Sequence, residues 1–327
     1  MNSDSISEAV LNTLRCSVCD YKLRRENDES LQCLRCRAQI EISDGIVKLL
    51  PEKMSVNNTR ELSARDDSTV WHAISSPFKR PAAVRRVYFE QAQMIRRSAI
   101  DIYENASILY LFGGDGLEAH LSGIMNERTI LSDLSHSALK HAQQRVESYR
   151  LPRPSAYVQC DAENLPFADR SYDIVVAFKG IHHCFIPQKA MAEVWRVTKK
   201  RAIVVDNWQC LLTDLLYRIN LSSRIEYSGL KPNRFNRISL LTMLYNAGIE
   251  NYYLEIMMPY LLDRYFGWRG RRFIQGIGNK VRQGNSFMLI LDRIETDLCR
   301  LARDRIAEYH ANPTNFTPSE QQPVMPA

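Results

Sequence analysis

The 327-residue chain lacks any apolar run that approaches the ~18 residues required by a membrane-spanning helix. Its first residues, MNSDSISEAVLNTLRC, contain no basic start followed by an apolar block. We therefore expect no secretory signal and a cytoplasmic location. Glycine and proline are scarce, with 13 of each, which excludes a collagen-like chain. At 45% hydrophobic residues, the chain can bury a core without staples, in about two domains.

The chain also lacks a large excess of positive or negative charge, because its net charge is only +6. Such a small excess does not by itself indicate a nucleic-acid partner. One segment, 264–282, nevertheless has basic residues, no acid and interleaved aromatic residues. It could contact RNA, rest on a membrane surface or cap a substrate pocket. Its basic residues are Arg264, Arg269, Arg271, Arg272, Lys280 and Arg282.

Four of the eight cysteines form two C-x2-C pairs separated by 13 residues: Cys16, Cys19, Cys33 and Cys36. Four thiolates at this spacing can surround a zinc ion tetrahedrally, and they leave no position open for chemistry. The alternatives are two disulfides or four free thiols, and the lack of a secretory signal disfavours disulfides. The following AQIEISDGIVKLL has the pattern of strand, turn and strand. We therefore predict a zinc ribbon with structural zinc in residues 1–55.

Beyond a polar linker, short apolar runs alternate with helical patterns from residue 106 onward. This alternation predicts an α/β, Rossmann-like fold, in which helices cover both faces of a mostly parallel sheet. An amphipathic helix with a basic face is predicted at 79–97. The predicted order after the ribbon is a linker and helical lid (56–105), a ligand-binding core (106–206), a C-terminal part with helical insertions at 207–236 and 257–284 (207–300), and a helix end with a disordered tail (301–327).

Ligands of parallel sheets bind at the carboxyl ends of the strands. Four segments should meet there: GGDG after the first strand, Asp133 after the second, Asp161 after the third, and 178–183 after the fourth. Glycines permit close approach of the backbone to a ligand. An acid after the second strand can accept two ribose hydroxyls, and one after the third can accept an exocyclic amino group. Together these features fit an adenosine ligand.

Residues 106–206 resemble the class I S-adenosylmethionine-dependent methyltransferases of the type-11 group, which includes quinone-biosynthesis enzymes. The resemblance implies S-adenosylmethionine as cofactor and a seven-stranded sheet whose last strand is antiparallel. Its most specific block is DAENLPF followed by SYDIVV. The matching segments are SILYLFGGDG (107–116), TILSDLSHSALKHAQQR (129–145), CDAENLPFADRSYDIVVAF (160–178), GIHH (180–183) and AEVWRVTKKRAIVV (192–205).

The same resemblance assigns roles to individual residues. It places glycines beside the methionine part of the cofactor, an acid at the ribose, a pair at the adenine, and a segment that lines the sulfonium and the acceptor. In this order the matching residues are Gly114 and Gly116, Asp133, Asp161 and Ala162, and Phe178 and Lys179.

The sequence departs from the family pattern in two places. Tyr110 stands where the first motif usually has an acid, and Phe112 stands where it usually has its first glycine. The loss of the acid removes a partner for the amino group of the cofactor, for which Asp115 could compensate in part. Further on, 199–201 (Lys-Lys-Arg) replaces the usual Pro-Gly-Gly turn.

Methyl transfer from a sulfonium is a direct displacement, so an enzyme mainly aligns donor and acceptor. A base is needed where the acceptor must lose a proton. His182 and His183 follow the fourth strand, where the acceptor should lie, and histidine can take up a proton near neutral pH. They are the candidate catalytic residues. The alternative is that one is buried and hydrogen-bonded while the other contacts the loop.

Three functions are compatible with these features. The first is a methyltransferase for a small-molecule acceptor, methylating oxygen, nitrogen or carbon. The second is an RNA base methyltransferase, because the ribbon and catalytic domain follow the same order as in a bacterial ribosomal-RNA guanine-N1 methyltransferase that the chain resembles. The third is a non-catalytic interaction module, suggested by Tyr110 and Phe112. The sequence does not indicate the oligomeric state.

Overall fold

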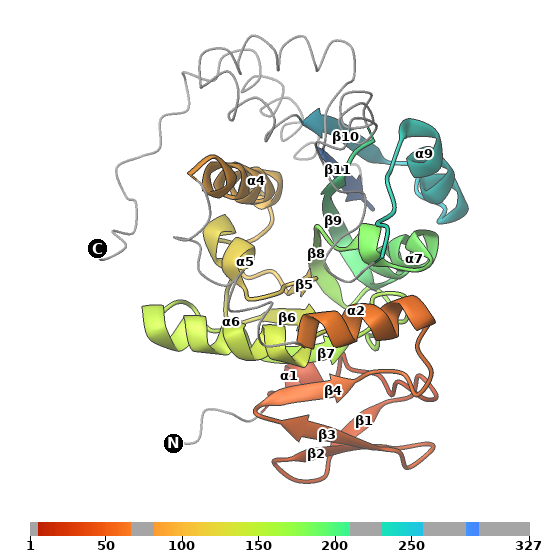
Figure 1. The fold of residues 1–327 in the computed structure, drawn as a ribbon. Helices are drawn as coiled ribbons and strands as arrows, with labels where there is room; N and C mark the ends of the chain where they lie inside the picture. Colours follow the sequence, from red (N-terminus) through yellow and green to blue (C-terminus); the bar gives the residue numbers. More distant parts are fainter. Residues whose placement is uncertain (1–5, 67–81, 210–229, 258–285, 294–327) are drawn as a thin grey trace.

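The computed structural model describes residues 6–66, 82–209, 230–257 and 286–293 (Figure 1). The basic segment 264–282, the predicted tail 301–327 and most of both predicted insertions lie outside these ranges. The described elements are α1 (Glu8–Leu11), β1 (Leu23–Arg25), β2 (Ser30–Cys33), β3 (Gln39–Ser43), β4 (Ile46–Leu49), α2 (Val56–Asp66), α4 (Ala82–Ala99), β5 (Ile108–Leu111), α5 (Leu117–Ser122), β6 (Thr129–Asp133), α6 (His136–Tyr149), β7 (Ala156–Cys160), β8 (Tyr172–Phe178), the 3-10 helix η2 (Ile181–His183), α7 (Pro187–Val197), β9 (Thr198–Asn207), α9 (Arg237–Asn246), β10 (Tyr252–Met257) and β11 (Ser286–Asp292).

The strands of the described ranges form a single sheet in the order β1-β2-β3-β4-β7-β6-β5-β8-β9-β11-β10. Strands β7, β6, β5, β8 and β9 run parallel, and every residue of β5 to β8 is buried. Continuous burial is what a parallel sheet covered on both faces requires, because neither face meets water. The predicted α/β, Rossmann-like architecture is confirmed.

The predicted strand count of seven is wrong, because the sheet has eleven strands. The seven expected strands are present, and β11 pairs antiparallel with β9, as the resemblance implied. The extra four belong to the N-terminal segment, whose β4 pairs in parallel with β7. Strands β1 to β4 therefore extend the sheet of the core. The sequence indicates each strand locally, but edge pairing between distant strands leaves no local pattern.

Helices cover the two faces of the sheet in separate groups (Figure 1). On one face, α4, α5 and α6 bury Ile95, Ala119 and Leu139 in a common apolar cluster with β5, β6 and β8. On the other face, α1, α7 and α9 contribute to a second cluster that also contains the apolar residues of the ribbon strands. The predicted helix at 79–97 is found as α4. Within the described residues, no helix is long and apolar enough to cross a membrane.

The segment before the first zinc-ligand candidate is joined to the loop that follows β7. Leu14 forms a β-bridge with Phe167, and Arg15 N donates to Pro166 O at 2.8 Å. Both Leu14 and Phe167 are fully buried. The hydrophobic core therefore runs without interruption from strands β1 to β4 into the parallel sheet. The predicted boundary at residue 55 stays a prediction.

Arg201 accounts for part of the charged stretch that replaces the expected Pro-Gly-Gly turn. Its guanidinium is 2% exposed, and Nε lies 2.6 Å from Asp292 Oδ1 while Nη1 lies 2.7 Å from Asp101 Oδ1. Nη1 also donates to Ser98 O at 2.6 Å. A buried guanidinium is tolerated when carboxylates and carbonyls satisfy its donors. Arg201 thus ties the end of α4 to β9 and β11.

Because the core is continuous, we expect Leu14→Ala to lower the free energy of unfolding of the whole chain by about 2–5 kcal/mol, the usual cost of such a buried truncation. The four tryptophans all lie beyond residue 55, so their fluorescence reports the unfolding of the core. The measurement is urea unfolding followed by tryptophan fluorescence. The control is Leu34→Ala, because Leu34 is an exposed leucine of the same ribbon. An unchanged tryptophan transition in Leu14→Ala would show that the ribbon unfolds by itself.

Candidate functional site

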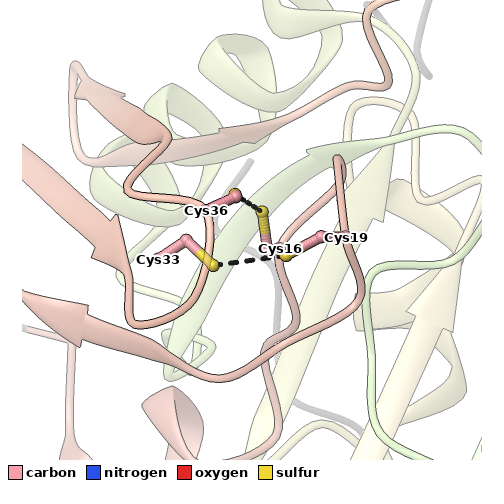
Figure 2. Close-up of side chains that lie close together, drawn as sticks. All are labelled: Cys16, Cys19, Cys33 and Cys36. Atoms are coloured by element: carbon pink, nitrogen blue, oxygen red, sulfur yellow. Dashed lines mark hydrogen bonds between the residues drawn. The ribbon is translucent and has the colours of Figure 1, made fainter.

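The sulfur atoms of Cys16, Cys19, Cys33 and Cys36 lie within 4.8 Å of one another (Figure 2). Cys16 Sγ is 3.6 Å from Cys36 Sγ, and Cys19 Sγ is 3.5 Å from Cys33 Sγ. In a tetrahedral site with Zn–S bonds of ~2.3 Å, the sulfurs are about 3.8 Å apart. The predicted cysteines therefore form a cluster that could hold a metal ion.

Each C-x2-C pair forms a turn of the same kind. The N–H of Val18 donates to Cys16 Sγ, and the N–H of Arg35 donates to Cys33 Sγ, each at 3.4 Å. Burial raises the pKa of the Cys16 thiol to about 12 in the metal-free chain. Burial also opposes ionisation of Cys33, but the N–H groups of Cys36 and Arg35 lower its pKa to about 6. A bound cation would hold all four sulfurs as thiolates, since coordination deprotonates a thiol.

The glycine-rich loop after β5 packs closely onto β6. Gly114 and Gly116 have φ values of 50° and 74°, in the left-handed region that glycine adopts without strain. A Cβ on Gly113 would lie 2.5 Å from Leu131 Cδ1. A residue without a side chain is therefore needed at Gly113, because the backbone of the loop packs directly against β6.

Asp133, the predicted ribose-binding acid, ends β6 and is nearly buried. Its Oδ2 accepts a hydrogen bond from Gly114 N at 2.8 Å, and its Oδ1 accepts one from Ser135 N at 2.9 Å. The carboxylate therefore links the glycine loop to the turn that starts α6.

Asp115 of the same loop is committed to a buried ion pair. Its Oδ2 lies 2.5 Å from Arg145 Nη2 of α6, and Arg145 Nε donates to Asp115 O at 3.0 Å. Both side chains are at least nine-tenths buried. Asp115 thus holds α6 against the loop and does not line the cavity described below.

Asp161, the predicted adenine-side acid, and a second buried acid both accept hydrogen bonds from the same side-chain amide. Asn58 Nδ2, from α2, donates to Asp161 Oδ2 at 2.9 Å and to Glu163 Oε1 at 3.2 Å. Glu163 N donates to Asp161 Oδ1 at 2.9 Å, and Phe185 N donates to Glu163 Oε1 at 2.6 Å. Two buried carboxylates placed close together need such donors to offset their mutual repulsion. The loop after β7 therefore depends on a side chain from the N-terminal part of the chain.

Helix α2 makes two further contacts along this edge of the sheet. Asp66 Oδ1 accepts bonds from Ser135 Oγ at 2.6 Å and Ser137 N at 3.1 Å. Glu61 Oε1 lies 3.2 Å from Nδ1 of His183. Through Asn58, Glu61 and Asp66, α2 spans the carboxyl ends of β6, β7 and β8. Figure 1 shows α2 beside the strand ends.

The two predicted catalytic histidines have different partners. His182 Nδ1 lies 2.5 Å from Asp206 Oδ1, and Asp206 Oδ2 accepts from His182 N at 3.2 Å. His183 pairs with Glu61 and has a 12% exposed side chain. The two imidazole rings are 4.0 Å apart between centroids. Because a carboxylate can only accept, each Nδ1 carries the hydrogen, and each Nε2 is the atom left to accept a proton.

A cavity of about 470 Å³, counted with the part open to solvent, lies at this edge. Four of the predicted site residues line it together: Asp133, Asp161, Ala162 and His183. They come from the ends of β6 and β7 and from η2. The structure therefore brings the predicted ribose acid, adenine pair and second histidine to a common cavity.

The other predicted residues do not line this cavity. Gly114 and Gly116 shape the loop beside it. Phe178 is buried against Tyr88 of α4, with ring centroids 6.2 Å apart. Lys179 Nζ lies 3.5 Å from Ser286 Oγ of β11. His183 lines the cavity and His182 does not, so the structure distinguishes the two candidate bases. Their roles stay predictions.

The sequence patterns did not point to three residues of this region, Asn58, Glu61 and Asp206. Asn58 and Glu61 lie in the stretch predicted as a linker, which has no apolar periodicity to mark its buried face. Asp206 lies near the carboxyl end of β9, the fifth strand of the core, so the strand-end argument that selected Asp133 and Asp161 could have found it.

Residues 113–205 match the family model of a methyltransferase domain. The ubiquinone/menaquinone biosynthesis C-methyltransferase of Klebsiella pneumoniae is 32% identical over 110 residues, which cover 32% of this chain and 44% of that protein. The protein of the same name from Haemophilus ducreyi is 32% identical over 110 residues, covering 32% and 42%. The chain thus spans less than half the length of these relatives.

Among solved structures, magnesium protoporphyrin IX methyltransferase from Synechocystis, with bound S-adenosylhomocysteine, superposes with a TM-score of 0.51. The match covers 73% of this chain and 100% of the other at 13% identity. Similarity at this level concerns the fold. Residues 113–205 thus match a methyltransferase family model, and the fold of this chain is similar to that of a solved methyltransferase.

Proposed function

We propose that the chain is an S-adenosylmethionine-dependent methyltransferase that acts on a small-molecule acceptor. The observation that carries the proposal is the convergence of Asp133, Asp161 and His183 on a common cavity from three separate strand ends. These are a ribose acceptor, an adenine-side acceptor and a titratable base, in the order that an extended adenosine ligand and its acceptor require. The relatives named as C-methyltransferases support the same reaction class.

The cofactor would lie across the ends of β5, β6 and β7. Asp133, whose carboxylate is held by Gly114 and Ser135, would accept the ribose hydroxyls. Asp161 and Ala162 would face the adenine edge. When bound, S-adenosylmethionine supplies a methyl group on a sulfonium that is already activated for displacement. The contribution of the protein is then alignment of the two reactants and exclusion of water.

His183 is the residue placed to take a proton from the acceptor, because it lines the cavity whereas His182 does not. Glu61 fixes the hydrogen on Nδ1 of His183, which leaves Nε2 as the base, and it stabilises the ring once protonated. In the same way, Asp206 fixes the hydrogen of His182 on Nδ1. Glu61 is therefore a positioning residue that acts through His183.

We also propose that the four-cysteine cluster holds one structural zinc ion. Four sulfurs at tetrahedral spacing form a closed ligand set, which suits structural rather than catalytic zinc. The ion would fix the turn just after Leu14 and Arg15, and these residues pair with the adenine-side loop.

We expect the wild type to bind S-adenosylhomocysteine with micromolar affinity, and Asp133→Asn to weaken this binding roughly 10- to 100-fold. The amide keeps the shape and can keep the bond from Gly114 N, but it removes the negative charge, and its NH2 group cannot accept a hydrogen bond. Isothermal titration calorimetry measures both. The matched control is Asp169→Asn, because Asp169 is an exposed aspartate paired with Arg196 outside the cavity. Equal affinity of Asp133→Asn and wild type would refute this ribose position, and no binding by the wild type would refute the proposed activity.

We expect His183→Gln to lower kcat by about 100-fold or more, the usual contribution of a general base. Transfer of labelled methyl to phenol, amine and quinol acceptors measures it, with His136→Gln as a control outside the cavity. Glu61→Gln should lower kcat less and should move the acidic limb of the pH profile to lower pH, because an amide no longer stabilises the protonated ring. A kcat for His183→Gln within about threefold of wild type would exclude the assigned base.

We expect the purified chain to contain one zinc per molecule, and Cys33→Ser to contain none and to melt at a lower temperature, because metal binding is coupled to folding. Elemental analysis and thermal unfolding check this. Cys299→Ser, outside the four-cysteine cluster, is the matched control. Retention of one tightly bound zinc in Cys33→Ser would contradict the four-thiolate site.

A further inference from the structure

Phe112 stands directly after β5 with a φ of 55°. This left-handed conformation is uncommon for a bulky side chain and is strained. The family resembled by the sequence has glycine here, which would adopt the same backbone without strain. A bulky residue retained in a strained position at the edge of a ligand cavity calls for a reason that involves its side chain.

The ring of Phe112 packs directly on Gly180, the residue before η2. A Cβ on Gly180 would lie 1.9 Å from Cγ and 2.1 Å from Cδ1 of Phe112. No residue with a side chain can stand at position 180 while the ring is in place. The two positions are therefore complementary: the glycine missing from 112 is matched by a glycine at 180.

This packing fixes where the ring lies relative to the cavity. Phe112 and Gly180 both line it, together with Asp133 and His183. If the ribose binds at Asp133 and the acceptor lies beside His183, the sulfonium must lie between them, in the same cavity. Phe112 is the one phenylalanine, tyrosine or tryptophan among the lining residues.

We propose that Phe112 is a cofactor-binding residue whose ring holds the sulfonium of S-adenosylmethionine by a cation–π contact. This inference rests on the proposed function and adds a specificity to it. A cation is attracted to an aromatic face, most strongly where water is excluded. The product S-adenosylhomocysteine is a neutral thioether at the same atom, so it gains no such attraction. Phe112 therefore favours the charged methyl donor over the neutral product.

The alternative is that the ring only fills the space over Gly180. Leucine separates the two roles, because it is bulky and bears the same backbone strain but has no aromatic face. Tyrosine keeps the aromatic face. Phe89→Leu is the matched control, because Phe89 is an exposed phenylalanine on α4 and does not line the cavity.

The test is calorimetric titration of the full chain with S-adenosylmethionine and, separately, with S-adenosylhomocysteine. We expect the wild type to prefer the charged ligand and Phe112→Leu to reduce this preference about 5- to 30-fold, the range of a desolvated cation–π contact. Phe112→Tyr and Phe89→Leu should keep the wild-type preference. Thermal unfolding of each variant confirms that it is folded.

The two proposals fail in different ways. If Phe112→Leu weakens both ligands equally, or neither, the ring acts by shape alone and the cation–π contact is refuted, while the proposed function stands. If the wild type binds neither ligand, the proposed function fails and this inference fails with it. If the wild type binds the neutral ligand as tightly as the charged one, the sulfonium does not meet the ring.

Discussion

The parallel pairing of β4 with β7 is the contact on which the arrangement of the candidate site depends. It sets Leu49 level with Cys160, the residue before Asp161. Because parallel strands end at the same edge of a sheet, the chain leaves β4 where ligands of the core would bind. Helix α2 follows after six residues and lies along that edge, which brings Asn58 to Asp161 and Glu61 to His183.

The edge covered by α2 is rich in buried acids, each of which has a hydrogen-bond or ion-pair partner. Asp133 accepts from backbone N–H groups, Glu163 from Asn58 and a backbone N–H group, and Asp206 and Glu61 pair with histidines. Buried carboxylates are stable under these conditions because hydrogen bonds and ion pairs compensate for lost hydration. The concentration of acceptors and negative charge suits a ligand with hydroxyl and amino donors and a cationic centre.

The departures from the family pattern have structural counterparts. Tyr110 is buried in the apolar cluster under α4 and α5, so the position of the usual acid serves packing. Phe112 is accommodated by the absence of a side chain at Gly180. Arg201, in the stretch that replaces a turn, joins α4 to β9 and β11 through two aspartates. Each substitution is explained by a partner that lies far away in the sequence.

The sequence by itself determined the four-cysteine cluster, the alternation of strands and helices, and the acids Asp133 and Asp161 at strand ends. Spacing and periodicity encode these features locally, and strand order then places the acids on one edge. Tertiary structure decided the eleven-stranded sheet, the pairing of Glu61 with His183, and the packing of Phe112 on Gly180. These depend on contacts between segments far apart in the chain, and such contacts leave no periodic trace in either segment.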